Sequence, residues 1–223
     1  LSVYARLRVL HVSGQRQMCI CARFKLHLGP KSPFLQYCGA NGPLGLKVGG
    51  QNMEGLICGG HYMAALRTGR VPSMIQVFDD AANGSDKTSL TPKIAEIKIS
   101  VSRDRKAARE FVKESSGTRV LNMYRQGYSR EDIQNLGVNL EDVEKLDEAD
   151  TAGVPPEVFD ALVTDDMVDA IFIAGEPGEC LERMLEVHNI AQSQGFHQLM
   201  FSELGPDVDE ALGLLVDEVI PSL

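Results

Sequence analysis

The amino-acid sequence predicts an α/β fold built on a parallel sheet. Two observations point to this class: short apolar runs typical of strands alternate with helical segments, and the connections between successive strands are long enough to contain a helix. Parallel strands need such connections, because the chain must return to the starting end of the sheet before it can pair again. We therefore expect helical crossovers between neighbouring strands.

The first unit, residues 34–60, reads as a strand, a glycine-rich turn, a short helix and a second strand. Residues 34–38 are apolar and aromatic, and residues 56–58 begin another buried strand. The turn between them consists of Gly39, Ala40, Asn41, Gly42 and Pro43. Backbone N–H groups in such a turn can face an anion at a helix N-terminus, although a plain tight turn fits this pattern equally well. We expect Gly49-Gly50 to end the short helix.

Two later units follow the same order. Alternating apolar residues mark a third strand over residues 95–101, with a helix over residues 104–124, and residues 197–202 form a fourth strand. Its helix, residues 207–220, has acidic residues in the first turn and Pro221 after its end. A helix over residues 176–194 has Pro177 near its start and Gly195 just beyond it, the usual asymmetry of helix ends.

Only four clear strand–helix units are present, whereas a complete eight-unit barrel takes about 250 residues. We interpret residues 1–223 as a single α/β domain, with residues 1–33 as an irregular lead-in and residues 129–169 as a helical insertion. The sequence thus predicts part of a larger barrel. The alternative is a compact half-barrel that stands on its own.

Composition excludes several classes of protein. The chain has 223 residues and a formal net charge of -9, and nucleic-acid binding relies on clustered Lys and Arg, so we expect no nucleic-acid partner. No apolar stretch approaches the ~20 residues that span a bilayer, so we expect no membrane segment and a cytoplasmic location. The 5 cysteines suggest no disulfide framework, and Cys19-Ile20-Cys21 has no second pair at zinc-like spacing. We assign no metal site.

Three groups of residues resemble motifs of the bacterial luciferase-like family. The central segment carries Gly39-Ala40-Asn41-Gly42-Pro43, Lys47, Gly49-Gly50 and Glu54-Gly55. The run AIFIAGEPGEC ends at Cys180, and the late turn is Gly205-Pro206-Asp207. The order and approximate spacing of these motifs also agree with the family.

Within this family the resemblance is closest to the coenzyme F420-dependent methylenetetrahydromethanopterin reductases. It implies a TIM (β/α)8 barrel of the luciferase-like type, of which this chain holds the C-terminal part, about four β/α units. It also implies hydride transfer between reduced coenzyme F420 and methylenetetrahydromethanopterin or a similar pterin-like one-carbon carrier, as in the one-carbon metabolism of methanogenesis. An FMN-dependent flavin monooxygenase and a truncated, non-catalytic binding or assembly module stay open as alternatives.

The resemblance also implies where a cofactor would bind. In a parallel barrel the ligand lies at the carboxyl ends of the strands, and in the family the glycine turn helps to hold the phosphate-bearing tail of the cofactor, F420 or alternatively FMN. The predicted cofactor-binding residues are Gly39, Ala40, Asn41, Gly42, Pro43, Gly59 and Gly60. Because the cofactor itself supplies the hydride chemistry, no acid–base pair is required and we assign no catalytic residue.

Other polar residues fit local structural roles better than catalytic ones. His61 follows the second strand and is more simply a cap or loop group than a ligand contact, and Glu203 is more simply a solvated loop carboxylate. Thr164 with Asp165 and Asp166 is typical of a helix N-cap with acids in the first turn.

An open sheet would leave two strand edges and, we expect, an apolar inner face exposed. Such surfaces favour pairing with another chain, so the sequence predicts a homo-oligomer.

Overall fold

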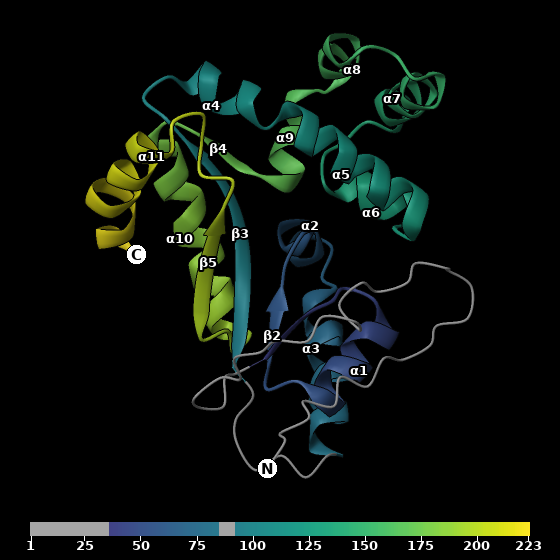
Figure 1. Ribbon diagram of the computed structural model, residues 1–223, viewed down its shortest axis with the longest axis vertical. Helices are drawn as coiled ribbons and strands as arrows, with labels where there is room; N and C mark the ends of the chain where they lie inside the picture. The colour runs from purple at the N-terminus through teal and green to yellow at the C-terminus, as the bar shows by residue number, and fades with distance from the viewer. Residues whose placement is uncertain (1–35, 85–91) are drawn as a thin grey trace, which may run out of the picture. The chain divides into compact units, whose positions relative to one another are not determined.

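The computed structural model describes residues 36–84 and 92–223, shown in Figure 1. The expected irregular lead-in, residues 1–33, lies outside the described residues. The strands are β1 (Tyr37–Gly39), β2 (Gly55–Cys58), β3 (Lys93–Val101), β4 (Ile173–Gly175) and β5 (Gln198–Ser202). The α-helices are α1 (Pro43–Asn52), α2 (Tyr62–Arg67), α3 (Val71–Asn83), α4 (Arg105–Phe111), α5 (Lys113–Gln126), α6 (Arg130–Asn135), α7 (Leu140–Ala152), α8 (Pro156–Leu162), α9 (Asp165–Ile171), α10 (Pro177–Ser193) and α11 (Val208–Leu214).

Every strand pair in the sheet is parallel, which confirms the predicted α/β class. The central strand is β3: β2 and β5 both pair with its first half and so flank it on opposite sides. Near its end, the Val101 N–H donates to Leu204 O and the next amide, that of Ser102, donates to Gly175 O. Successive amides of a strand point to opposite sides. Because Leu204 follows β5 and Gly175 ends β4, β4 lies on the same side of β3 as β2, and β5 lies alone on the other side.

The alternation along β3 separates two faces of the sheet. Ala95, Ile97, Ile99 and Val101 are fully buried in a core that also contains side chains of α3, α10 and α11. The intervening residues include Glu96 and Lys98, which form hydrogen bonds on the opposite face. The expectation of an apolar inner face was therefore wrong, because β3 places charged side chains there.

The segment between α5 and β4 has a hydrophobic core of its own. Residues 129–169 contain α6, α7, α8 and most of α9, and their apolar side chains pack against α5. Ile133, Val143 and Leu146 are fully buried in this second cluster. Gly117 of α5 allows close packing, since a Cβ there would lie 2.6 Å from Val163 Cγ2.

Several expected boundaries shifted. The helix expected over residues 104–124 is two helices that meet at Val112, and the last helix continues beyond α11 as a π-helical turn, Leu215–Val219, and a 3-10 turn, Ile220–Ser222. Strand β4 was not predicted as a strand, because its three residues continue the apolar run of α9.

The glycine pair in α1 does not end the helix as expected, since α1 continues to Asn52. Both glycines are buried and permit close packing. A Cβ on Gly49 would lie 2.3 Å from Cys38 Sγ, and one on Gly50 would lie 2.3 Å from Phe78 O of α3. Their role is to let α1 approach β1 and α3.

Replacing Gly50 with Ala should therefore destabilise the protein. We expect Gly50→Ala to lower the free energy of unfolding by about 1–3 kcal/mol, because overpacking against a rigid carbonyl outweighs the ~1 kcal/mol gained in helix propensity. The matched control is Gly178→Ala in α10, where an added Cβ meets nothing within 4 Å. Urea denaturation should show a lower midpoint for Gly50→Ala alone; equal midpoints would contradict the packing role.

Candidate functional site

The predicted glycine turn joins the end of β1 to the start of α1. Gly42 occupies the N-cap position with φ -92 and ψ 152, and Pro43 is the first helical residue. Within the described residues, no side chain caps this helix. The amide groups of Leu44 and Gly45 therefore lack an acceptor from their own helix and lie at the positive end of its dipole. This end of α1 can bind an anion.

The second predicted loop, Gly59–Gly60, lies beside this turn. Gly60 has φ +68, and a Cβ on it would lie 3.6 Å from Asn41 Nδ2. The Gly60 N–H donates to Glu96 Oε2 at 2.9 Å, and a Cβ on Gly59 would lie only 2.2 Å from the same oxygen. The structure thus brings the two predicted loops together, and a side chain at position 59 would displace the Glu96 carboxylate from its present place beside the Gly60 amide.

A cavity of about 670 Å³ opens beside the turn. Its volume lies within the usual range of about 300–1,000 Å³ for small-molecule sites. Of the seven predicted cofactor-binding residues, Asn41, Gly42 and Pro43 line it, and Gly39, Ala40, Gly59 and Gly60 do not. The remaining wall comes from α1, α2, α3 and α5: Leu46, His61, Ala65, Arg70, Ser73, Met74, Val77, Asn122, Met123, Gly127 and Tyr128.

Arg70 is the cationic side chain of this cavity, and sequence reasoning missed it. Its guanidinium stacks 4.1 Å from the centre of the Tyr128 ring, donates to Gly127 O at 3.1 Å and pairs with Asp132 at 3.4 Å. These contacts hold the guanidinium of Arg70, paired with Asp132, in the wall of the cavity that the start of α1 also lines. The only signal in the sequence was a basic residue before a helix start, which is too common to single out.

His61 also lines the cavity, with its ring edge-on to Tyr128 at 6.2 Å between centroids. It occupies the N-cap position of α2 but makes no side-chain cap, so the expected capping role was wrong. Burial, followed by the nearby cations Arg119 and Lys98, lowers the pKa of His61. The imidazole is therefore neutral at neutral pH.

A network of charged groups joins the middle of β3 to the carboxyl end of β5. Lys98 Nζ, on a side chain only 6% exposed, donates to Glu203 Oε1 at 2.5 Å and pairs with Glu96 at 3.4 Å. Glu203 also accepts from Arg119 Nη2 at 2.8 Å and from Ser115 Oγ at 2.8 Å. Through Glu96, the network reaches the Gly60 amide.

Glu203 is not the solvated loop carboxylate that the sequence suggested. Its φ of 60 makes it the one non-glycine residue with positive φ in the described part of the chain, a conformation that needs support from its surroundings. Burial alone would raise the pKa of its carboxyl, but hydrogen bonds from Lys98 and Ser115 and the cations Lys98 and Arg119 outweigh burial and lower the pKa.

This lowered pKa makes a prediction about acid stability. A carboxylate with a folded-state pKa below its unfolded value of about 4.3 stabilises the protein above that pH, and the contribution is lost as pH falls through the folded pKa. We expect Glu203→Gln to be less stable than the parent at neutral pH and to lose less stability on acidification. Urea unfolding across this pH range measures the difference; parallel curves would show that Glu203 gains nothing from its cations.

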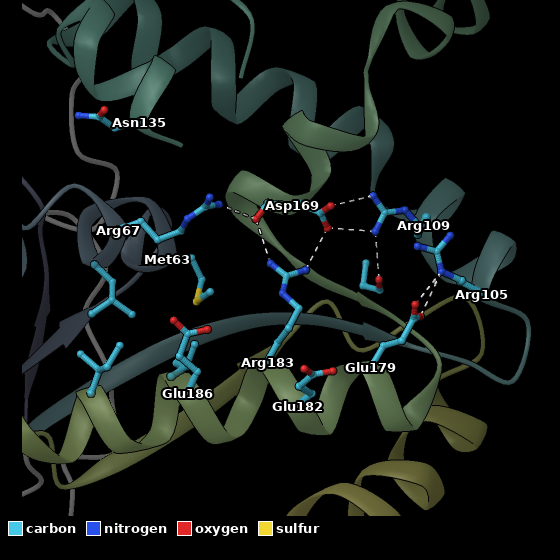
Figure 2. A pocket seen from close by; sticks show the side chains of 14 residues that line it. Met63, Arg67, Arg105, Arg109, Asn135, Asp169, Glu179, Glu182, Arg183 and Glu186 are labelled. Atoms are coloured by element: carbon cyan, nitrogen blue, oxygen red, sulfur yellow. Dashed lines mark hydrogen bonds and ion pairs between the residues drawn. The ribbon is translucent and has the colours of Figure 1, made fainter. Parts of the chain in front are cut away.

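A second cavity, of about 740 Å³, is lined mainly by α2, α4, α9 and α10 and is shown in Figure 2. Asp169 is its centre: the carboxylate accepts from Arg109 and Arg183, both at 3.0 Å, and its backbone O accepts from Arg67 and Arg183. Arg109 also contacts Asp165 and donates to Ala174 O. This arrangement connects α4, α9 and α10, so we interpret it as structural.

Thr164 Oγ1 accepts from the Met167 N–H, which confirms the predicted N-cap of α9. Asp165 pairs with Arg109 and so belongs to this structural network. Another histidine, His197, accepts from the Lys93 N–H at the amino end of the sheet, away from the glycine turn. None of these three residues shows an arrangement that points to catalysis.

The structural role of Arg109 can be tested by truncation. We expect Arg109→Ala to lower the free energy of unfolding by about 1–3 kcal/mol, below the cost of breaking a fully buried pair because the side chains of Asp165 and Asp169 are 71% and 42% exposed. Arg105 is the control, since its side chain is 52% exposed and its pair with Glu179 lies on the surface. Arg105→Ala should cost about 0–1 kcal/mol. Chemical denaturation that ranks the two variants equally would contradict this interpretation.

Within the described part of the chain, no group of three or more His, Cys, Asp or Glu side chains could hold a metal ion. The helices of that part include none that is both long and apolar enough to cross a membrane.

The family follows from a model described as luciferase-like monooxygenase, which matches residues 12–194. The chain belongs to this family. The 5,10-methylenetetrahydromethanopterin reductase of Methanopyrus kandleri is 26% identical over 193 residues, which cover 86% of this chain and 51% of that protein. The expected resemblance is thus confirmed, and the chain spans about half the length of this relative.

Solved structures of luciferase-like proteins agree with the fold. The coenzyme F420-dependent tetrahydromethanopterin reductase of Methanopyrus kandleri superimposes with a TM-score of 0.62 at 27% identity, over 83% of this chain and 50% of that one. An F420-dependent secondary alcohol dehydrogenase, solved with an F420–acetone adduct, gives a TM-score of 0.56 at 19% identity, over 88% of this chain and 51% of that one. The second likeness concerns the fold alone.

Proposed function

We propose that this chain supplies the cofactor-tail site of an F420-dependent oxidoreductase of the luciferase-like family. The observation that carries the proposal is the N-terminus of α1, which has no side-chain cap and opens on a cavity of about 670 Å³ that Arg70 also lines. The F420 dependence of the related reductase from Methanopyrus kandleri supports the choice of cofactor.

The residues of the turn fit a phosphate group. A Cβ added at Gly39 or Gly42 would meet nothing within 4 Å, so the space in front of the turn is open to a ligand. The amides of Leu44 and Gly45 and the guanidinium of Arg70 would supply donors and positive charge. Asn41, Ser73 and Asn122 add neutral polar groups to the same cavity.

The proposed reaction is hydride transfer between reduced F420 and a pterin-like one-carbon carrier such as methylenetetrahydromethanopterin. When bound, the deazaflavin supplies the hydride chemistry, and the protein positions it and excludes water. In this chain, Glu96 would hold the Gly59–Gly60 loop against the cofactor turn, and the Lys98–Glu203 pair would fix the polar end of the sheet. The similarity to the 5,10-methylenetetrahydromethanopterin reductase of Methanopyrus kandleri supports this choice of substrate. Self-association of the chain remains a prediction.

The turn can be tested with a pair of nearly isosteric variants. Asp and Asn are both favourable N-cap residues, so Gly42→Asp and Gly42→Asn should fold alike, but only the carboxylate repels a phosphate. We expect F420 to bind the parent chain, with its fluorescence quenched, and Gly42→Asp to weaken this binding at least about tenfold more than Gly42→Asn does. A parallel titration with FMN tests the alternative cofactor.

The outcomes separate the candidate functions. Selective FMN binding, lost in Gly42→Asp, would overturn the F420 assignment in favour of an FMN-dependent monooxygenase. Equal effects of the Asp and Asn variants would show that no anionic group lies at the turn. Failure of the parent chain to bind either cofactor would favour a non-catalytic binding or assembly module.

A further inference from the structure

Three side chains from distant parts of the chain converge on the carboxylate of Glu203. Its Oε1 accepts from Lys98 Nζ at 2.5 Å and from Arg119 Nη2 at 2.8 Å, and its Oε2 accepts from Ser115 Oγ at 2.8 Å. Arg119 Nε also donates to Ser115 Oγ at 3.2 Å, which fixes the hydroxyl in place. Hydrogen bonds from cations to a carboxylate are among the strongest in proteins. Strand β3 and helix α5 thus form a site that fits one carboxylate.

This site requires an anion. Lys98 and Arg119 donate to the same oxygen of Glu203, so two positive charges lie side by side. The Lys98 side chain is only 6% exposed, and its other carboxylate partner, Glu96 at 3.4 Å, also accepts from Ser202. Arg119 has no second carboxylate partner among the residues that the structure describes. A cation that is removed from water without a counter-ion is costly.

The backbone at Glu203 is unusual for an acidic residue. Its φ of 60 lies in the left-handed region, which favours glycine. The backbone on both sides is held independently, because Ser202 pairs with Lys98 across the sheet and Leu204 O accepts from the Val101 N–H. The Glu203 side chain can therefore leave the site by rotation about its own bonds. A residue kept in an unfavourable conformation is a pointer to function.

The site lies beside the cavity of the glycine turn. Arg119 is one helical turn before Asn122 on α5, and Asn122 lines that cavity. The pKa of His61, another lining residue, is lowered by burial and then by Arg119 and Lys98, so both cations lie near this wall. Glu203 follows the carboxyl end of β5, the end at which ligands bind in parallel barrels. The side chains of Glu203 and Arg119 are 29% and 26% exposed, so a ligand can reach them.

We propose that Lys98, Arg119 and Ser115 form a second anion subsite, which the Glu203 carboxylate occupies and a carboxylate group of the substrate takes over on binding. The substrate carboxylate would accept the same three hydrogen bonds, and the Glu203 side chain would turn toward solvent. The inference rests on the proposed function, because the substrate is the one that meets the cofactor. Its test uses no cofactor, so failure of the F420 titration and failure of this subsite are distinguishable.

Acetate is the probe, since it carries the proposed group and little else. Glu203→Gly removes the resident carboxylate and suits the left-handed backbone. We expect Glu203→Gly to bind acetate about ten- to a hundredfold more tightly than the parent, which must first release its own carboxylate. Adding Arg119→Gln to Glu203→Gly should weaken acetate binding at least about tenfold, because a charged donor is lost. Isothermal titration calorimetry at neutral pH and constant ionic strength measures the affinities.

Glu144→Ala is the matched control. It frees Arg130 from an ion pair whose side chains are 67% and 44% exposed, and an exposed cation alone should bind no acetate. Thermal unfolding gives a second readout: acetate should raise the melting temperature of Glu203→Gly more than chloride at the same concentration does. If Glu203→Gly does not fold, Glu203→Gln takes its place, since an uncharged occupant should yield to acetate more readily than the parent carboxylate.

Three results would overturn the proposal. Absence of acetate binding by the folded Glu203 variant would show that the donors form no subsite. Binding that the Arg119→Gln change leaves unaltered would place acetate elsewhere on the protein. Absence of binding by the parent chain at about 100 times the dissociation constant of the variant would show that Glu203 is a permanent structural link that no ligand displaces.

Discussion

The carboxylate of Glu96 is the contact on which the candidate site depends. One oxygen accepts from the Gly60 amide and the other from Ser202 Oγ at 2.8 Å, so a single side chain of β3 joins the loop after β2 to the end of β5. Lys98, two residues further along the same face, continues the connection to Glu203. Because the Gly59–Gly60 loop lies against Asn41, the position of the glycine turn follows from the polar face of β3.

The sequence predicted the elements with strong local signals. The alternation in β3, the proline and glycine at the ends of α10 and the acidic start of α11 all appear where expected. Strand β4 has no such signal, because its three residues lie within an apolar run without period 2 or 3.6. Glu96 and Lys98 were visible as the polar half of the alternation in β3, so the expectation of an apolar inner face disregarded a signal that was present.

Contacts between distant residues explain the rest of what the sequence could not predict. Arg70 is held at the cavity by Tyr128 and Asp132, which follow it in the chain after three helices and a strand. Glu203 owes its left-handed backbone to partners on β3 and α5. Neither residue type nor spacing encodes such contacts, since they arise only when the sheet brings the segments together.

The distribution of charge favours an anionic ligand beside the glycine turn. Although the net charge is -9, the amides at the start of α1 favour an anion in the cavity beside the glycine turn. Arg70, Lys98 and Arg119 are each paired with a carboxylate, from Asp132, Glu96 or Glu203. Acidic residues are concentrated elsewhere: α7 carries six acidic residues and one Lys, and residues 207–223 carry five acidic residues and no basic one. Neither segment lines the cavity, so the excess negative charge of the chain does not oppose an anionic ligand there at close range.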